Sequence, residues 1–549
     1  MMTGSQVLLE TLKSLNIRNI FGYPGGAVLT IFDALYHDTD MEFILTRHEQ
    51  GAAHAADAFG RVTGKPGVCI ATSGPGGTNL VTGIMTAYMD SSPMIAITGQ
   101  VPQSSRGLDN FQEVDIIGVT LPITKHSFTI ERVEDIPTIL KEAYYIATTG
   151  RPGPVVIDIP ADVQLGTLET SLFKELLRKE VTPPPGKESS IESECIAKIS
   201  ELINRAEKPV IVAGAGVIKS RASRMMVRFA EDNSIPVVMS LLGLGSIPGE
   251  HSLSLGMGGI HGKVGAHVAL KETDLVIALG VRFENRFTED NPDFLRGVKI
   301  IHVDIDASEL GKNMKTEIAV HGDAGDVLTK LLEVKQEIPE RKEWLRRVEE
   351  LKESREEESP SKKGHLTPKT IFNVLNSKTS DNTILCTDVG QHQMWTAQHY
   401  NFTSPTQLVT SGGAGSMGFG IPAALGVKAA IPHSQVISIV GDGGFQMTSQ
   451  ELTCLKEYNL PVTIIILNNS CLGMVKQLQD IHKEGRHMAV HLGTNPDFVA
   501  LAKAHGINGI RVTDQEEFTQ AVDESITGSE TTVIECIVDI NERVYTSTS

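Results

Sequence analysis

One stretch of the chain combines an acidic residue, several glycines and an amide at a spacing that suits a phosphate and a cation. The apolar run ending at Val440 is followed by Gly441-Asp442-Gly443-Gly444, where a strand would pass into a helix. Backbone N–H groups in such a turn suit a phosphate, and the Asp442 carboxylate suits a hard cation held against it. Asn469 follows VTIIIL, whose composition predicts a buried parallel strand. A right-handed crossover would bring both strand ends to one sheet edge, so Asp442 and Asn469 could share the cation.

A second carboxyl group with a chemical interpretation is Glu49, within TRHEQGAAHAADAFGR. It follows the predicted strand EFILT and precedes an Ala-rich helix, with Gly51 at the turn. Small apolar neighbours favour the protonated carboxyl, which could then share its proton with a ring nitrogen. Taken alone, an acidic residue at a helix N-terminus is the simpler interpretation of Glu49, as a turn or capping residue is for Asp442 and Asn469.

The composition predicts an ordinary water-soluble protein of several domains. The chain has 549 residues, a hydrophobic fraction of 40% and a formal net charge of −18. That charge argues against a nucleic acid or an anionic membrane as the main partner. The six cysteines are scattered without CxxC spacing, which favours reduced core thiols over disulfides or zinc. Reduced thiols predict a cytoplasmic protein, and no apolar run approaches the roughly 20 residues needed to span a membrane. An organellar protein whose transit peptide has been removed is the alternative.

The elements that position these residues fall into three predicted α/β domains, each with a doubly wound parallel sheet. Short apolar strands alternate with helical stretches over residues 1–165, again over 190–335, and again over 366–549. The proline-containing segment 166–190 is predicted to be a surface linker. The charged segment after residue 335 is predicted to be a solvated helix followed by a second linker.

Gly-Asp-Gly closing with Asn-Asn at this spacing resembles the metal and diphosphate motif of thiamine-diphosphate (ThDP) enzymes. That resemblance implies that Asp442, Asn469 and the main-chain carbonyl of Cys471 bind Mg²⁺. It also implies that the three domains are the pyrimidine, middle and pyrophosphate domains, and that Glu49 bonds the aminopyrimidine ring. The family places these two motifs on different subunits, so a homodimer with its active site at the interface is expected.

Motifs along nearly the whole chain resemble one family in particular, the acetohydroxyacid synthase (acetolactate synthase) catalytic subunits. They include FGYPGGA, TSGPGGTN, FQEVD, GRPGPVVIDIP, DVGQHQMW, SGGAGSMGFG and LGMVKQ. The resemblance implies catalytic roles for Gly25, Gln112 and Arg286 beside Glu49, and substrate contacts for Phe111 and Leu478. It implies that ThDP is bound by Gln391, His392, Gly415, Met417, Gly441, Gly443, Gly444 and Met474. Without the family resemblance, most of these residues would be interpreted as packing residues.

Members of this family also bind FAD in the middle domain, although their net reaction has no redox step. The residues implied as flavin contacts are Arg151, Gly214, Gly216, Gly245, His261, Arg282, Asp304 and Asp323. Two departures bear on this domain. VRFENRF replaces the usual RFDDR and GAGVIKS replaces the usual GGG. Arg286 is retained, and a planar bidentate donor suits the carboxylate of a second substrate.

The implied reaction is decarboxylation of pyruvate and transfer of the two-carbon unit to a second 2-keto acid. Pyruvate as acceptor would give 2-acetolactate, and 2-ketobutyrate would give 2-aceto-2-hydroxybutyrate, in branched-chain amino-acid synthesis. Leu478 stands where the family has a tryptophan that favours 2-ketobutyrate, so a weak preference is expected. Two dimers could pair into a tetramer, and a separate regulatory small subunit could bind the chain. The competing hypotheses are pyruvate oxidation or simple decarboxylation on the same fold, and a ThDP-fold protein that only binds or scaffolds.

Overall fold

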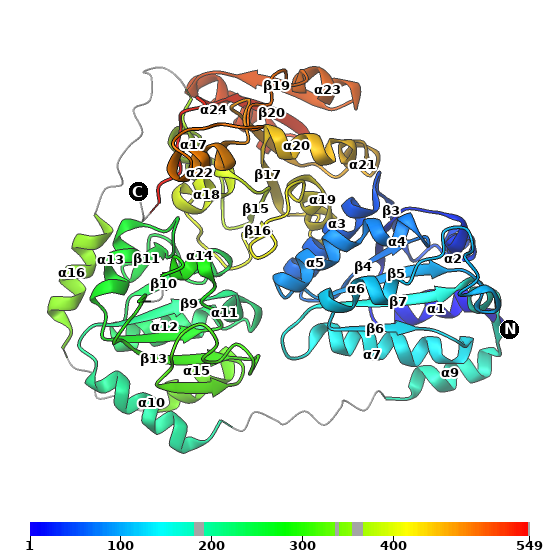
Figure 1. The fold of residues 1–549 in the computed structure, drawn as a ribbon, viewed down its shortest axis with the longest axis horizontal. Helices are drawn as coiled ribbons and strands as arrows, with labels where there is room; N and C mark the ends of the chain where they lie inside the picture. Colours follow the sequence, from blue (N-terminus) through cyan, green and yellow to red (C-terminus); the bar gives the residue numbers. More distant parts are fainter. Residues whose placement is uncertain (181–190, 292, 335–339, 354–365, 547–549) are drawn as a thin grey trace.

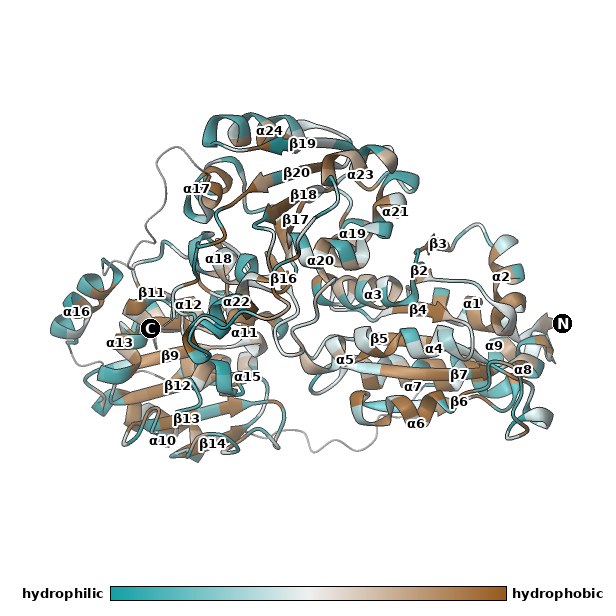
Figure 2. Ribbon diagram, turned by 45° about the horizontal axis from the view of Figure 1, so that its top comes forward, coloured by the Kyte–Doolittle hydropathy of each residue, from teal (hydrophilic) through white to brown (hydrophobic). Residues whose placement is uncertain are grey.

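The computed structural model describes residues 1–180, 191–291, 293–334, 340–353 and 366–546, and these build three α/β domains (Figure 1). Each domain contains a six-stranded sheet in which every strand pair is parallel. Figure 2 shows mostly hydrophobic strands flanked by helices of mixed hydropathy. This is the pattern expected of strands buried on both faces, and it confirms the predicted fold class.

The N-terminal domain has the strand order β3-β2-β4-β5-β7-β6. Its strands are β2 (Asn19–Gly22), β3 (Glu42–Leu45), β4 (Gly67–Ala71), β5 (Met94–Gln100), β6 (His126–Thr129) and β7 (Pro154–Pro160). Its main helices are α1 (Gly4–Ser14), α2 (Leu29–Tyr36), α3 (Glu49–Thr63), α4 (Pro75–Asn79), α5 (Val81–Met89), α6 (Ile116–Thr120), α7 (Ile136–Thr148) and α8 (Ala161–Leu165).

This domain continues beyond the predicted boundary at residue 165. A short strand, β8 (Thr167–Leu168), pairs antiparallel with β1 (Met2–Thr3), and α9 (Thr170–Arg178) follows it. Phe173 of α9 is buried in the same hydrophobic cluster as α1 and α7. The segment predicted as a surface linker is therefore ordered structure in its first half, because apolar positions in a polar sequence pack on α7. Its proline run lies outside the described residues.

The middle domain has the strand order β11-β10-β9-β12-β13-β14, which in chain order is 3-2-1-4-5-6. Its strands are β9 (Pro209–Ala213), β10 (Val237–Met239), β11 (Ser254–Met257), β12 (Leu275–Leu279), β13 (Lys299–Asp304) and β14 (Ile318–His321). Its helices are α10 (Ser193–Arg205), α11 (Ala215–Lys219), α12 (Ser223–Asn233), α13 (Val264–Glu272), α14 (Asn285–Thr288) and α15 (Ala324–Glu333). This strand order belongs to dinucleotide-binding folds, in which the ligand lies where the order reverses.

The charged helix predicted after residue 335 is α16 (Lys342–Lys352), and it is more than a solvated helix. Trp344, Val348 and Leu351 are buried in a cluster with α13, and the Trp344 indole donates a hydrogen bond to the Pro209 carbonyl. One apolar stripe in a charged sequence is enough to attach this helix to the middle domain.

The third domain has the strand order β16-β15-β17-β18-β20-β19. Its strands are β15 (Thr383–Thr387), β16 (Leu408–Thr410), β17 (Gln435–Gly441), β18 (Thr463–Asn468), β19 (Asn508–Val512) and β20 (Thr532–Ile537). Its helices are α17 (Pro368–Lys378), α18 (Gln391–His399), α19 (Gly420–Ala430), α20 (Asp442–Thr448), α21 (Leu452–Glu457), α22 (Gly473–His482), α23 (Phe498–Ala504) and α24 (Gln515–Thr527). In chain order the N-terminal and third sheets are both 2-1-3-4-6-5.

The N-terminal and third domains share one core through α3 and α19, which lie side by side (Figure 1). Alanines fill the buried face of α3, and Gly426 of α19 is so close that an added Cβ would lie 2.0 Å from the Ala55 carbonyl oxygen. Small residues at this contact let the two backbones approach and fix the domains relative to one another.

Two general expectations can be compared with the described residues. All six cysteines are free thiols, as predicted, and all but Cys195 are buried. Among the helices of the described ranges, none has the length and apolar character required to cross a lipid bilayer.

Candidate active site

The third domain brings three strand ends to one edge, and the predicted diphosphate residues surround a cavity there. Gln391 begins α18 after β15, Asp442 begins α20 directly after β17, and Asn469 follows β18. The cavity has a volume of about 60 Å³. Of the predicted residues, those lining it are Gln391, His392, Met417, Gly441, Asp442, Gly443, Gly444, Asn469, Cys471 and Met474. The predicted crossover from β17 to β18 is therefore confirmed.

The two proposed metal-binding side chains are held by specific partners. The Asn495 amide donates to Asp442 Oδ2 at 2.8 Å and to Asn468 Oδ1 at 3.1 Å. The Asn469 amide donates to Gln391 Oε1 at 3.2 Å, while its own Oδ1 accepts the Cys471 N–H at 3.2 Å. Burial raises the pKa of Asp442 to about 6, against the opposing hydrogen bond from Asn495. A buried carboxylate that is costly to charge gains from a nearby cation, so this donor set fits a hard metal ion.

His392 adds a ring nitrogen to the polar groups at this cavity. Its side chain is buried, and within the described chain its Nε2 has no hydrogen-bond partner. Burial lowers the pKa of His392 to about 3, against a hydrogen bond to the Asp388 backbone, so the ring is neutral and has a single N–H. Nε2 donates to an anion only in the tautomer that carries this proton on Nε2. A Cβ at Gly390 or Gly441 would lie 2.9 or 3.0 Å from the His392 ring. Glycines thus keep the approach open, and these residues fit a bound diphosphate.

Two residues that hold this edge together were not singled out from the sequence. Asn495 lies in a loop 53 positions after Asp442, too far along the chain for a local spacing argument. Asp388 is buried at the end of β15 and accepts the backbone N–H groups of Val389 at 2.7 Å and Gly418 at 2.8 Å. Burial raises the pKa of Asp388 to about 7. An isolated acidic residue inside DVGQHQMW gives no signal for this role.

The N-terminal domain gathers three of the four predicted catalytic residues, Glu49, Gly25 and Gln112, at its own carboxyl edge. Glu49 is the first residue of α3 and accepts a hydrogen bond from the Asn79 amide at 3.0 Å. Gly25 lies against Thr72, where an added Cβ would be 2.5 Å from that side chain. Gly51 lies inside α3 and not at a turn, and its Cβ would meet Glu451 at 2.5 Å.

Gln112 and Phe111 complete this edge from the segment after β5. Gln112 has a φ of +60°, which residues with a side chain rarely adopt, and it packs against Gly74, the residue before α4. Phe111 is 88% exposed. Neither these residues nor Glu49 line the cavity of the third domain. Within one chain, therefore, the described structure forms two partial sites and does not join them.

The middle domain contains a separate pocket of about 260 Å³ at the point where its strand order reverses. Five of the eight predicted flavin residues line it: Arg151, Gly216, Arg282, Asp304 and Asp323. At this point an added Cβ at Gly214 would lie 2.0 Å from the Gly280 carbonyl oxygen. Gly214, Gly245 and His261 do not line the pocket. The His261 ring instead contacts the Tyr545 carbonyl oxygen, with Nδ1 3.4 Å from it.

Three further predicted residues lie outside these cavities. Arg286 is exposed on α14, with its backbone N–H donating to the Glu284 carboxylate at 2.9 Å. Leu478 is half-buried on α22. Gly415 is exposed, with a φ of +64° that favours glycine. Their predicted roles stay predictions.

Comparison with known proteins matches each of the three domains. The thiamine pyrophosphate enzyme N-terminal TPP binding domain matches residues 2–119, the central domain 196–331, and the C-terminal TPP binding domain 388–536. A probable acetolactate synthase large subunit of Methanocaldococcus jannaschii is 47% identical over 553 residues, covering 99% of this chain and 93% of the relative.

The chain belongs to the acetolactate synthase large-subunit family. An acetolactate synthase large subunit of Lactococcus lactis is 42% identical over 545 residues, covering 99% of this chain and 93% of that protein. The acetolactate synthase isozyme 3 large subunit of Escherichia coli is 38% identical over 557 residues, covering 99% and 96%. Membership in this family of thiamine pyrophosphate enzymes agrees with the fit of a diphosphate to the third-domain cavity.

Proposed function

We propose that this protein is an acetolactate synthase, which releases CO₂ from pyruvate and joins the remaining two carbons to a second 2-keto acid. With pyruvate as acceptor the product is 2-acetolactate, and with 2-ketobutyrate it is 2-aceto-2-hydroxybutyrate. The observation that supports this most is the third-domain cavity, where Asp442, Asn469 and His392 meet in a chain of this family. The reaction belongs to branched-chain amino-acid synthesis, and we propose a cytoplasmic location.

The residues of the third-domain edge would hold the cofactor. Asp442, Asn469 and the carbonyl of Cys471 would bind Mg²⁺, and His392 and Gln391 would contact the diphosphate. Bound ThDP supplies a ring carbon that attacks the keto group and a ring system that accepts the electron pair left by CO₂. Glu49 would exchange a proton with the aminopyrimidine, and the Gly25 N–H would stabilise developing oxyanion charge.

These roles require a second copy of the chain. Glu49, Gln112 and Gly25 lie at one sheet edge and the Asp442–Asn469 cavity at another, and no described contact joins them. We propose a homodimer in which the N-terminal edge of one chain closes the third-domain cavity of its partner. Exposed apolar side chains at the N-terminal edge, with Phe111 at 88% and Leu108 at 69%, support this arrangement. Assembly of two dimers into a tetramer is part of the proposal.

We further propose FAD in the middle-domain pocket and a separate small regulatory subunit. The dinucleotide-type strand order and five lining residues of the predicted set support FAD. The relatives are named large subunits, which supports a small partner. Purified protein should be yellow, or become so when FAD is added. A colourless, fully active protein without FAD would reject this cofactor while leaving the ThDP proposal intact.

One assay tests the proposed reaction. Purified protein with ThDP, Mg²⁺ and pyruvate should form acetolactate, and omission of ThDP or addition of a chelator should stop it. Acetaldehyde as the main product would favour simple decarboxylation, and acetate with reduced flavin would favour pyruvate oxidation. Binding of ThDP without any turnover would favour the scaffold hypothesis. Glu42→Gln is a suitable control for site variants, because Glu42 lies at the amino end of β3 and contacts Asn19.

A further inference from the structure

The segment Ser411–Gly418, here called the methionine loop, connects β16 to α19 and places Met417 in the third-domain cavity. The loop has no helix or strand, and Gly415 and Gly418 have φ values of +64° and +82°. A chain this rich in glycine has many accessible conformations, and fixing it costs conformational entropy. The position of Met417 therefore depends on contacts made from outside the loop.

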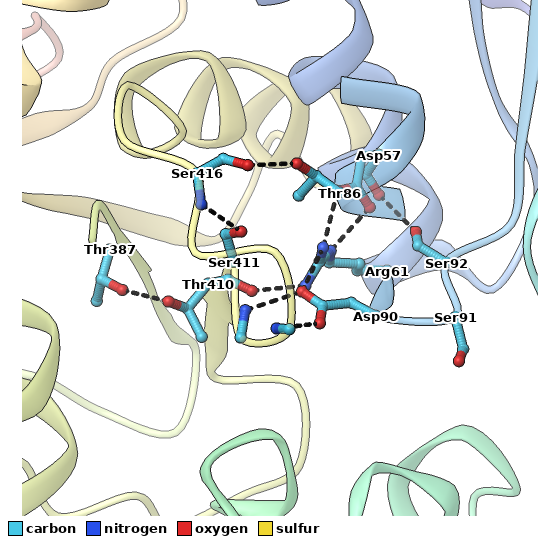
Figure 3. Close-up of polar contacts among 12 residues, drawn as sticks. Asp57, Arg61, Thr86, Asp90, Ser91, Ser92, Thr387, Thr410, Ser411 and Ser416 are labelled. Carbon is cyan, nitrogen blue, oxygen red and sulfur yellow. Dashed lines mark hydrogen bonds and ion pairs between the residues drawn. The ribbon is translucent and has the colours of Figure 1, made fainter. Parts of the chain in front are cut away.

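Several of these contacts come from the N-terminal domain. Asp90 accepts the N–H of Gly412 at 2.9 Å through Oδ2 and the N–H of Gly413 at 2.7 Å through Oδ1 (Figure 3). Arg61, in the last turn of α3, contacts Asp90 at 3.0 Å and donates to the Thr410 carbonyl oxygen at 2.6 Å. Both acidic partners of Arg61, Asp57 and Asp90, are buried. Charged hydrogen bonds in such surroundings are directional and costly to rearrange.

The far end of the loop is fixed as well. The hydroxyls of Thr86 and Ser416 are 2.7 Å apart, and the Ser416 N–H donates to Ser411 Oγ at 3.0 Å (Figure 3). Gly418 donates to Asp388 in the third domain. The loop is thus held mainly by α3 and α5 of the N-terminal domain at one side and by its own domain at the other.

Ser91, the residue after Asp90, contacts the middle domain. Ser91 Oγ accepts a hydrogen bond from Arg151 Nε at 2.8 Å, and its carbonyl oxygen accepts one from Lys219 Nζ at 2.9 Å. Arg151, Lys219 and Ser91 all line the middle-domain pocket. Ser91 has a φ of +56°, a conformation that a serine keeps only where its surroundings impose it.

Two consecutive residues therefore link two different sites, and Asp90 itself also lines the middle-domain pocket. Asp90 bonds the loop of the third-domain cavity, and Ser91 bonds the cations of the middle-domain pocket. We propose that Arg61, Asp90 and Ser91 are positioning residues that couple the two pockets, so that a phosphate-bearing dinucleotide in the middle domain tightens ThDP binding at the third domain. The proposal rests on the proposed function, since it takes FAD as the ligand of the middle pocket.

The expected sign of the coupling follows from ordering. A ligand between Arg151 and Lys219 restricts the junction that also contains Asp90, and so restricts the methionine loop. When ThDP then binds, the methionine loop is already ordered, so ThDP binding loses less conformational entropy. The coupling is therefore positive. By linkage, bound ThDP must tighten FAD binding by the same factor. This gives FAD a role in a reaction without a redox step.

The experiment compares ThDP affinity with and without FAD in full-length protein supplied with Mg²⁺. Isothermal titration gives the affinity, and fluorescence of Trp395, which lines the cavity, gives an independent signal. In the native protein we expect FAD to tighten ThDP binding about 5- to 150-fold, the usual range of such coupling. Ser91→Ala removes the Oγ acceptor of Arg151 and keeps the carbonyl acceptor of Lys219, so each cofactor should still bind alone and the coupling factor should fall severalfold.

A second variant tests the loop contact, and because Asp90 also lines the middle-domain pocket, its ThDP affinity is measured both with and without FAD. Asp90→Asn should weaken ThDP binding about tenfold or more whether or not FAD is present, because it removes the charged acceptor of two loop N–H groups. Its kcat at saturating ThDP should stay near the native value while the ThDP requirement rises. Thr86→Val, which removes the bond to Ser416 and the bond within α5 to the Thr82 carbonyl oxygen, should act in the same direction. It replaces Asp90→Asn if that variant does not fold.

The matched control is Ser92→Ala, which removes the neighbouring hydroxyl that donates to the Asp57 carbonyl oxygen. It should leave the coupling factor unchanged. Equal coupling in the native protein and in Ser91→Ala would overturn the proposal while leaving the FAD assignment in place. Unchanged ThDP affinity in both Asp90→Asn and Thr86→Val would overturn the positioning role. If the native protein binds no FAD, the flavin part of the proposed function fails and the coupling fails with it.

Discussion

The N-terminal and third domains have the same strand order, yet their carboxyl edges differ in one respect. The third-domain edge is enclosed, with Asp442 and His392 buried in a cavity. The N-terminal edge is open, with Glu49 half-buried and Phe111 exposed. The same fold thus supplies two different halves of a site. The third-domain half encloses a ligand cavity, and the N-terminal half is open and needs another surface packed on it. The difference indicates that the open half is completed by another chain.

The largest expected effect is on turnover in Glu49→Gln. An amide cannot exchange a proton with the aminopyrimidine, so kcat should fall about 10²- to 10⁴-fold, the usual contribution of a positioned acid or base. ThDP affinity should change little, because the diphosphate is held at the other edge. Steady-state kinetics and isothermal titration measure the two quantities. Native turnover would remove Glu49 from the mechanism.

Mixing two inactive variants tests whether the halves come from different chains. If Glu49 acts in the partner's cavity, a dimer of one Glu49→Gln chain and one Asp442→Ala chain retains one intact site. Activity should therefore reappear after the two proteins are mixed and their subunits exchanged. The control is each variant exchanged with itself. Continued inactivity despite proven mixed dimers would show that both residues serve one chain's site.

Removing the proposed metal ligand Asp442 should weaken cofactor binding more than removing Asn495, which only donates a hydrogen bond to Asp442. Asn495→Ala, which releases the Asp442 carboxylate, should weaken Mg²⁺ and ThDP binding about 10- to 100-fold, and Asp442→Ala should cost more than that. Titration of each variant gives the affinities. Asp523→Ala, which removes a surface ion pair with Lys378, is the control. A reversed order of the two effects would contradict the metal assignment.

A smaller effect is expected at Leu478 on α22. Leucine lacks the flat face of the tryptophan found in the family, so we expect weak preference for 2-ketobutyrate over pyruvate as acceptor. Leu478→Trp should raise this preference about tenfold, within the range that one methylene group is worth in an apolar pocket. A competition assay with both keto acids measures it. A strong preference for 2-ketobutyrate in the native protein would mean that residues other than Leu478 form the apolar surface against its extra methyl group.

The remaining prediction concerns stability and not activity, and it is a pH dependence at Asp388. Burial raises its pKa from the ordinary 3.8 to about 7, so between these values the folded state holds a proton that the unfolded state has lost. Stability contributed by this group therefore falls as pH rises from about 4 to about 7, by at most about 1.4 kcal/mol per pH unit. Asp388→Asn should remove that slope. Melting curves of both proteins from pH 5 to pH 8 compare the slopes, and parallel curves would contradict the prediction.

Local patterns in the sequence determined the three α/β domains and part of the diphosphate cavity, whereas its other predicted residues were implied only by the family resemblance. Gly441 to Gly444 and Asn469 each follow an apolar strand, and parallel strands bring such positions to one edge whatever the rest of the chain does. The pocket of the middle domain was harder to predict from the sequence. Only five of its eight predicted residues line it, and His261 contacts the Tyr545 carbonyl oxygen instead. Its contacts depend on loop paths that no periodicity describes.

Only the tertiary structure decided which residues support these sites from a distance. Asn495 is brought to Asp442 by a loop 53 residues later, and Asp90 reaches Gly412 across 322 residues. Phe173 and Trp344 lie in segments whose polar composition predicted solvent exposure, yet both are buried. The physical reason is the same in each case. Strand and helix patterns arise between near neighbours in sequence, whereas buried hydrogen bonds and core contacts form wherever packing brings unrelated segments together.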